Sequence, residues 1–241
     1  EEADHNSFFF MFGKLKQEVW QANQRLPESG LVILTWGNVS VIDRKAGVIA
    51  IKPSGMPYES MTPEDIVICN LEGDVVEGCR RPSSDLMTHL ELYKAWPDIG
   101  AVVHTHSTFA TMQAQTGEDL EPLGTTHADT FHGAVPCSRE LTGEEIRRAY
   151  ERETGHVIVQ TFQERDLDPM AVPGILVSRH GPFTWGADAA HAVENAVILE
   201  QCARMAIMDR LLRPDLGPVS QALLDEHYYR KHGVHATYGQ G

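Results

Sequence analysis

The sequence has few cysteines, fewer basic than acidic residues and no long apolar run, and each shortage argues against a class of protein. The four cysteines among 241 residues show no C-x-x-C spacing, so neither a zinc knuckle nor a redox pair is indicated. No stretch approaches the roughly 18 consecutive apolar residues of a membrane span, and the start lacks the pattern of a signal peptide. We therefore expect a cytoplasmic protein that does not enter a membrane.

The charge balance is acidic. Lys and Arg number 20 against 34 Asp and Glu, which gives a formal net charge of -14. Such a surface repels a phosphate backbone at long range, so nonspecific binding to nucleic acid or to an anionic membrane is not expected. A small phosphorylated ligand remains compatible, because it would be held by a local group of backbone amides and hydroxyls.

The composition, 42% hydrophobic and 22% charged, is that of a globular chain, and no repeat or long linker divides it. We expect one domain over residues 11–241. Residues 1–10, EEADHNSFFF, read as a cloning remnant or a disordered extension. The alternative is a short arm that packs its three phenylalanines.

Apolar periodicity predicts an alternation of helices and strands. The predicted helices lie at 13–27, 84–96, 142–153, 187–211 and 220–231. The predicted strands lie at 31–35, 39–43, 48–51, 66–70, 101–106 and 174–178. The run HVIVQTF at 156–162 fits either state. Closely spaced strands interleaved with helices favour a layered α/β domain with antiparallel pairing.

Histidines form the first candidate site. His104 and His106 are two positions apart in a predicted strand, so they project from the same face and can hold one ion. His180 follows another strand, just before Gly181 and Pro182, where a turn would expose it. The alternative is a set of imidazoles that are satisfied or exposed without any metal.

Asp85 would complete this set if the helix at 84–96 begins beside the strands. Three imidazoles and one carboxylate suit zinc, and also manganese or cobalt. The alternative for Asp85 is simple capping of its helix.

Three turns form a second candidate site, because they combine glycines with donors that suit a phosphate: TWGN at 35–38, KPSG at 52–55 and PSSD at 82–85. Glycine lets the backbone approach a ligand closely, and the start of a helix favours an anion. Each turn alone is also an ordinary turn or cap. The candidate substrate residues are Gly37, Asn38, Lys52, Ser54, Gly55, Ser83 and Ser84.

Taken together, these motifs carry a resemblance. The sequence resembles the L-ribulose-5-phosphate 4-epimerases of the class II aldolase family over about residues 12–241, and the wider family, with L-fuculose-1-phosphate aldolase, shares the phosphate turns and the H-x-H. The segments that match in order are TWGNVS, IKPSG, PSSD, HTH, GTTHAD, SRHGPFTWG, LLDEHYYRKHG and YGQG.

The resemblance implies roles for residues. Asp85, His104, His106 and His180 would bind a divalent metal, usually zinc, and the residues of the three turns would hold the substrate. Asp129 of THAD and Tyr238 of YGQG would act as acid and base, and His227 would lie nearby and bind the substrate. From the residues alone these three read as a turn aspartate, a surface tyrosine and a helix-face histidine. The implied fold is a three-layer α/β/α domain with a mostly antiparallel sheet, assembled as a homotetramer with active sites between subunits.

The implied reaction interconverts L-ribulose 5-phosphate and D-xylulose 5-phosphate by retro-aldol cleavage and re-addition at C3–C4. Fuculose-phosphate aldolases resemble this chain but carry glutamate where Asp85 stands, and the shorter aspartate favours the epimerase. A simple aldolase that releases both fragments is one alternative. A non-enzymatic binding module is another, but such relatives would be expected to lose metal ligands, and all four are present here.

Overall fold

A seven-stranded antiparallel sheet forms the centre of the protein. The computed structural model describes residues 12–234 and 236–237, so residues 1–10 and Tyr238 lie outside the described part. The strand order is β4-β3-β2-β1-β5-β7-β6, and every neighbouring pair is antiparallel, as predicted. The strands are β1 (Gly37–Asp43), β2 (Val48–Ile51), β3 (Val67–Asn70), β4 (Val75–Glu77), β5 (Ala101–Thr105), β6 (Gly174–Val177) and β7 (Gly181–Gly186).

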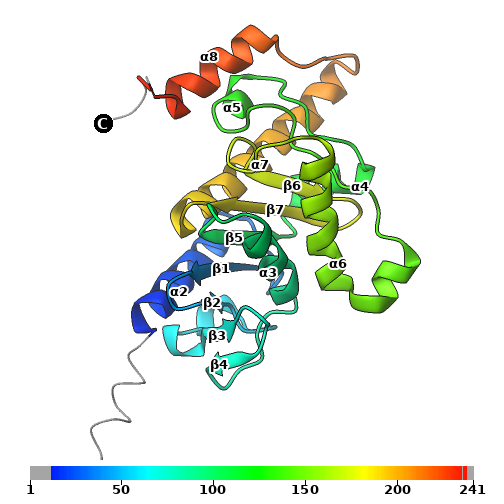
Figure 1. Cartoon of the computed structure of the whole chain (residues 1–241). Helices are drawn as coiled ribbons and strands as arrows, with labels where there is room; N and C mark the ends of the chain where they lie inside the picture. The colour runs from blue at the N-terminus through cyan, green and yellow to red at the C-terminus, as the bar shows by residue number, and fades with distance from the viewer. Residues whose placement is uncertain (1–11, 235, 238–241) are drawn as a thin grey trace, which may run out of the picture.

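Helices cover both faces of the sheet (Figure 1). They are α2 (Gly13–Glu28), α3 (Leu86–Ala95), α4 (Thr108–Thr116), α5 (Thr125–Ala128), α6 (Gly143–Glu164), α7 (Ala189–Leu212) and α8 (Gln221–His232), with short 3-10 turns η1 (Tyr58–Ser60) and η2 (Pro63–Asp65). None of the helices in the described residues is long and apolar enough to cross a membrane.

Side chains alternate between two cores along the strands. Ile49 and Ile51 of β2 pack with α3, α4 and α6 on one face, whereas Val48 and Ala50 pack with α2 and the start of α7 on the other. Because both faces of β2 are buried, the strand appears in the sequence as a short, wholly apolar run, which is how it was predicted. The result is the predicted three-layer α/β/α arrangement.

One predicted strand is wrong. Residues 31–35 form a turn, in which Leu34 has a φ of 55° and the amide of Trp36 donates to the carbonyl of Ile33. Ile33 and Leu34 are exposed, whereas Leu31 of the same apolar run is buried. The apolar run therefore forms a loop beside the start of β1 and adds no strand to the sheet.

The ambiguous run at 156–162 is helical, because the helix predicted at 142–153 continues through it as α6. Thr142 caps α6, exchanging hydrogen bonds with Glu145 in a capping box. The helix departs from helical geometry at Ala149, where φ is -169° and ψ is 72°. Strands β4 and β7 and helices α4 and α5 were not predicted.

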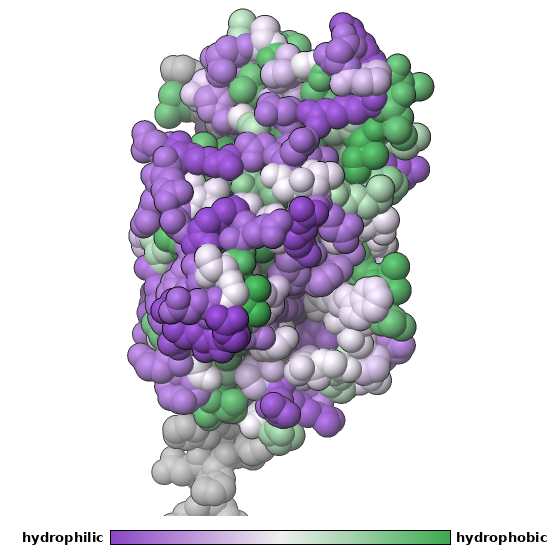
Figure 2. All heavy atoms as spheres, turned by 90° about the vertical axis from the view of Figure 1, so that its right-hand side faces the viewer, coloured by the Kyte–Doolittle hydropathy of each residue, from purple (hydrophilic) through white to green (hydrophobic). Residues whose placement is uncertain are grey.

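Helices α5 and α8 lie together beyond the end of the sheet, at the top of Figure 1. Figure 2 shows the face that carries α6. Hydrophilic side chains cover most of this face, and hydrophobic side chains lie mainly toward its right-hand edge.

Candidate metal and phosphate site

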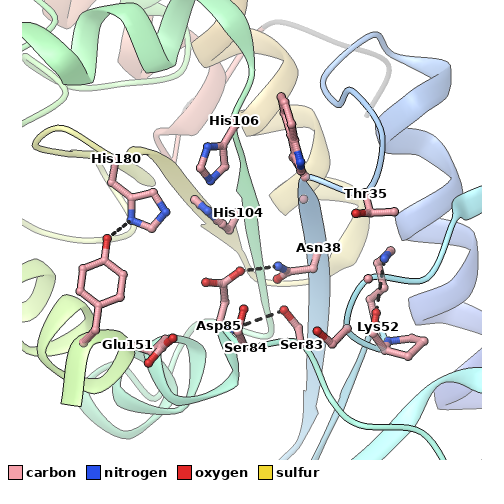
Figure 3. A pocket seen from close by; sticks show the side chains of 16 residues that line it. Thr35, Asn38, Lys52, Ser83, Ser84, Asp85, His104, His106, Glu151 and His180 are labelled. Carbon is pink, nitrogen blue, oxygen red and sulfur yellow. Dashed lines mark hydrogen bonds between the residues drawn. The ribbon is translucent and has the colours of Figure 1, made fainter. Parts of the chain in front are cut away.

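Three histidines come together where β5 ends and β7 begins (Figure 3). One ligand nitrogen from each of His104, His106 and His180 lies within 4.8 Å of the others. Their ring centroids are 4.7 to 5.0 Å apart. The structure thus joins the H-x-H pair to a histidine that is more than 70 positions away in the chain.

The donor set fits a divalent cation. Burial, followed by repulsion from His104 and His106, lowers the pKa of His180 to about 3, and burial also lowers the pKa of His106. Nδ1 of His104 donates to the carbonyl oxygen of Pro182 at 2.9 Å, which leaves Nε2 with its lone pair. Neutral imidazoles with free lone pairs are the ligands that zinc and similar metals take.

The segment that follows β5 is also fixed by a contact with α7. Helix α4 begins two residues after His106, and the buried carboxylate of Glu200 on α7 accepts the amides of Phe109 and Ala110 at 2.9 and 2.8 Å. A carboxylate at a helix N-terminus satisfies amides that have no partner within the helix. This contact fixes the start of α4, and with it the turn that carries His106.

Asp85 lies next to the histidines, at the N-cap of α3 (Figure 3). Its carboxylate makes no capping bond to the helix, and it accepts a hydrogen bond from Asn38 Nδ2 at 2.7 Å. Burial raises the pKa of Asp85, but His104, His89 and the Asn38 hydrogen bond outweigh it and hold the pKa below its usual range. The side chain is therefore an anion that faces the histidines, which argues against the capping alternative.

The histidines and the polar turns share one cavity of about 460 Å³. Every residue predicted to hold the metal or the substrate lines this cavity, with the exception of His227. The β1–β5 register places Asn38 directly opposite His104, which explains how the first turn reaches the histidines.

Two glycines of these turns are required by geometry. A Cβ on Gly37 would lie 3.1 Å from the carbonyl oxygen of His104 and 2.6 Å from the side chain of Val32. Gly55 has a φ of +65°, in the left-handed region that favours glycine. The second and third turns are joined by a hydrogen bond from the Ser83 amide to the Lys52 carbonyl at 2.9 Å.

Lys52 is a buried cation in the wall of the cavity, with 2% of its surface exposed. Its ammonium donates to the carbonyl of Met56 at 2.7 Å and lies 4.8 Å from the centroid of the Tyr58 ring. Burial lowers the pKa of Lys52 to about 8. No carboxylate is paired with it in the described residues, so an anion entering the cavity would meet an available positive charge.

Two lining residues, Tyr150 and Glu151, were not predicted from the sequence. Three others, Thr35, Trp36 and Pro53, lie within the predicted turns but were not among the candidate substrate residues. Tyr150 and Glu151 come from α6, where no motif marks them. Tyr150 Oη lies 3.2 Å from His180 Nδ1, and burial raises the pKa of Tyr150, which keeps its hydroxyl protonated.

Asp129 and His227 lie together, but they do not line this cavity. His227 Nδ1 is 2.9 Å from Asp129 Oδ1, and Arg230 and Lys231 of α8 pair with the same carboxylate at 3.2 and 3.3 Å. Burial raises the pKa of Asp129, but the hydrogen bond from His227 and the charge of Lys231 and Arg230 outweigh it, so the pKa lies below its usual range. We call these four residues the α5–α8 cluster.

The fold and the cavity define the class of protein. Residues 17–207 match the family described as "Class II Aldolase and Adducin N-terminal domain", and the chain belongs to this family. Its solved relatives include an L-fuculose 1-phosphate aldolase with a TM-score of 0.74 and 26% identity, covering 88% of this chain and 95% of that one. The L-fuculose-1-phosphate aldolase of Thermus thermophilus has a TM-score of 0.67 and 25% identity, covering 86% of this chain and 99% of that one.

Curated relatives are more similar still. The L-ribulose-5-phosphate 4-epimerases UlaF of Salmonella paratyphi A and of Salmonella typhi are each 53% identical to this chain over 227 residues. The match covers 94% of this chain and 99% of each relative. The family resemblance read from the motifs is therefore confirmed.

Proposed function

We propose that this protein is a metal-dependent epimerase that interconverts L-ribulose 5-phosphate and D-xylulose 5-phosphate. The observation that carries the proposal is the single cavity in which three imidazoles and the phosphate-type turns lie together, in a chain 53% identical to 4-epimerases of that substrate over 94% of its length. Asp85 beside the histidines is the shorter carboxylate that favours the epimerase.

We assign the reaction to cleavage and re-formation of a carbon–carbon bond, the route that the family resemblance implies. C4 of the substrate has no adjacent carbonyl, so a carbanion at C4 would not be stabilised. Removing the proton from the C4 hydroxyl and breaking C3–C4 instead yields the enediolate of dihydroxyacetone and glycolaldehyde phosphate. The aldehyde turns its other face to the enediolate, and the bond re-forms with the opposite configuration.

We assign the metal to His104, His106 and His180, with Asp85 as the fourth candidate ligand. Zinc is our first choice for this nitrogen-rich set, with manganese or cobalt as alternatives. When bound, such a metal supplies Lewis-acid stabilisation of the negative charge that develops on the substrate oxygens.

The turns would retain the fragment that carries the phosphate. We assign this role to Ser54, Gly55, Ser83, Ser84 and Lys52. The two serines stand at the start of α3, where the helix dipole favours an anion, and Lys52 adds a buried positive charge. A fragment anchored through its phosphate can rotate its carbonyl carbon without leaving the cavity.

Proton transfer would come from a neighbouring subunit. We assign the acid and base roles to Asp129 and Tyr238, with His227 beside Asp129. The α5–α8 cluster does not line the cavity of its own chain, so it can serve a cavity only across a subunit boundary. We therefore propose active sites between subunits, in the homotetramer that the family resemblance implies. With all four cysteines free, we place the enzyme in the cytoplasm.

An aldolase is the second candidate, supported by the fold similarity to L-fuculose 1-phosphate aldolase. The two functions differ in whether the fragments leave. The test is to incubate the metal-loaded protein with L-ribulose 5-phosphate beside an aldehyde-trapping dehydrogenase. Conversion to D-xylulose 5-phosphate with little trapped glycolaldehyde phosphate supports the epimerase, and release of both fragments at the rate of substrate loss supports the aldolase.

A further inference from the structure

Tyr150 reaches into the cavity from α6 and contacts one of the three histidines. Its hydroxyl oxygen lies 3.2 Å from Nδ1 of His180, and the two rings are tilted by 30° with centroids 6.0 Å apart. The other ring nitrogen of His180 turns toward His104 and His106 (Figure 3). The Tyr150 hydroxyl therefore contacts the ring nitrogen of His180 that faces away from His104 and His106.

Packing sets the position of Tyr150. The break in helical geometry at Ala149 ends just before it, and the hydroxyl of Thr154 donates to its carbonyl at 2.8 Å. The next residue, Glu151, accepts at its carbonyl a hydrogen bond of 2.6 Å from Thr88 of α3.

The two helices also approach very closely. A Cβ on Gly155 of α6 would lie 2.7 Å from the Cβ of Glu91 on α3. The backbone that carries Tyr150 is thus fixed to the helix that begins beside Asp85, and from it the partly exposed tyrosine side chain reaches His180.

A hydrogen bond at this ring nitrogen is expected for a histidine that binds a metal. An imidazole that binds a metal through one nitrogen carries its proton on the other, and that N–H is normally donated to an acceptor that fixes the ring and its tautomer. For His104 the acceptor is the carbonyl of Pro182, at 2.9 Å from Nδ1. At Nδ1 of His180 the structure places the Tyr150 hydroxyl, whose oxygen can accept such an N–H.

We propose that Tyr150 is a positioning residue for His180, whose Nδ1–H it accepts so that Nε2 faces the metal. This inference rests on the metal-dependent function proposed above. Tyr150 holds the ring of the one histidine that neither β5 nor its adjoining turn carries. It also ties the geometry of the metal centre to the packing of α6 on α3.

The test is the variant Tyr150→Phe, which removes the hydroxyl and keeps the ring. Metal affinity is measured by competition with a chelator for zinc and for cobalt, and the ligand field is read from the visible spectrum of bound cobalt. Loss of an outer partner of a metal-ligating histidine costs about 10- to 100-fold in metal affinity. We expect a loss in that range, a changed cobalt spectrum, and recovery of much of the activity when zinc is in large excess.

A matched control is Tyr229→Phe, which removes a hydroxyl from a tyrosine that is 52% exposed on α8. It should leave metal affinity and the cobalt spectrum unchanged. Thermal unfolding of the metal-free proteins checks that neither variant is misfolded. A second readout needs no variant: nitrogen-15 NMR of zinc-loaded wild type should show His180 protonated at Nδ1.

The outcomes separate this inference from the proposed function. Wild type that binds zinc tightly beside a Tyr150→Phe variant with equal affinity and an identical cobalt spectrum overturns the role of Tyr150 alone. Zinc-loaded wild type with His180 protonated at Nε2 overturns it as well. Wild type that binds no divalent metal overturns the proposed function, and the role of Tyr150 with it.

Discussion

His227 donates a hydrogen bond from Nδ1 to the carboxylate of Asp129 at 2.9 Å, although 98 positions separate the two residues. The contact joins α8 to the end of α5. Arg230 and Lys231 surround the same carboxylate, so Asp129 is ionised at neutral pH. The carboxylate proposed as a base is therefore held by contacts within the chain, away from the cavity of the same chain.

The first prediction concerns the pair of proton carriers. Asp129→Asn and Tyr238→Phe each remove one acid or base group and leave the histidines and the phosphate turns untouched. We expect kcat to fall by roughly 100-fold or more in each variant, a common size for one such group. Steady-state kinetics and metal analysis check this. Near-normal epimerisation by both variants would leave Asp129 as a turn residue and Tyr238 outside the mechanism.

The second prediction concerns assembly. Sedimentation should show a tetramer. If each site combines a cavity from one subunit with an α5–α8 cluster from another, His104→Asn and Asp129→Asn subunits should complement each other. Tetramers reassembled from an equal mixture should recover about a quarter of wild-type activity, because random pairing restores that share of the sites. A fully active monomer, or a mixture as inactive as its two parents, would contradict a shared site.

The third prediction concerns the phosphate anchor. Ser84→Asp places a negative charge at the start of α3, inside the cavity, and should raise KM for the phosphorylated substrate sharply through charge repulsion. Free L-ribulose should turn over poorly with the wild type. The control Ser60→Asp adds the same charge at an exposed position outside the cavity and should keep the parent KM. An unchanged KM in Ser84→Asp would place the phosphate elsewhere.

The fourth prediction is a pH dependence that follows from Lys52. A lysine is charged below its pKa, and burial lowers the pKa of Lys52 to about 8, so the positive charge is lost as pH rises through 8. We expect kcat/KM, which reports the free enzyme, to fall above about pH 8. Lys52→Met should have low kcat/KM throughout and lack this inflection, whereas Lys45→Met, at an exposed site, should retain it. A profile in Lys52→Met that parallels the wild type would assign the inflection to another group.

Parts of the fold could be predicted because local pattern and tertiary environment agree. Residues 48–51 form a short apolar run between turn residues, and both faces of the strand are buried, so the strand is visible in the sequence. Residues 31–35 show the opposite case. They have the composition of a strand, but the chain turns at Leu34 and leaves Ile33 and Leu34 exposed. Local composition alone does not predict this turn.

The site divides in the same way. His104 lies in β5 and His106 directly after it, as the H-x-H spacing predicted, and the serines and glycines occupy recognisable turns, so local sequence patterns are enough to identify these residues. Tyr150 enters the cavity because α6 bends at Ala149 and packs closely on α3. The residues around Tyr150 form no motif that would predict this bend or this packing. Helix α6, strands β6 and β7 and helix α7 lie between Asp129 and His227 in the chain, so their proximity was available from the resemblance and not from the residues.

The most direct test of the account is the conversion of L-ribulose 5-phosphate by one preparation in three states: as purified, stripped by a strong chelator, and reloaded with zinc. Carbon-13 NMR follows the appearance of D-xylulose 5-phosphate, with His104→Asn carried through the same three states. The account predicts conversion by the purified and reloaded wild type, none by the stripped protein, and weak metal uptake with little conversion by the variant. Full conversion by a protein shown to be free of metal, or no conversion after reloading with zinc, manganese or cobalt, would contradict it.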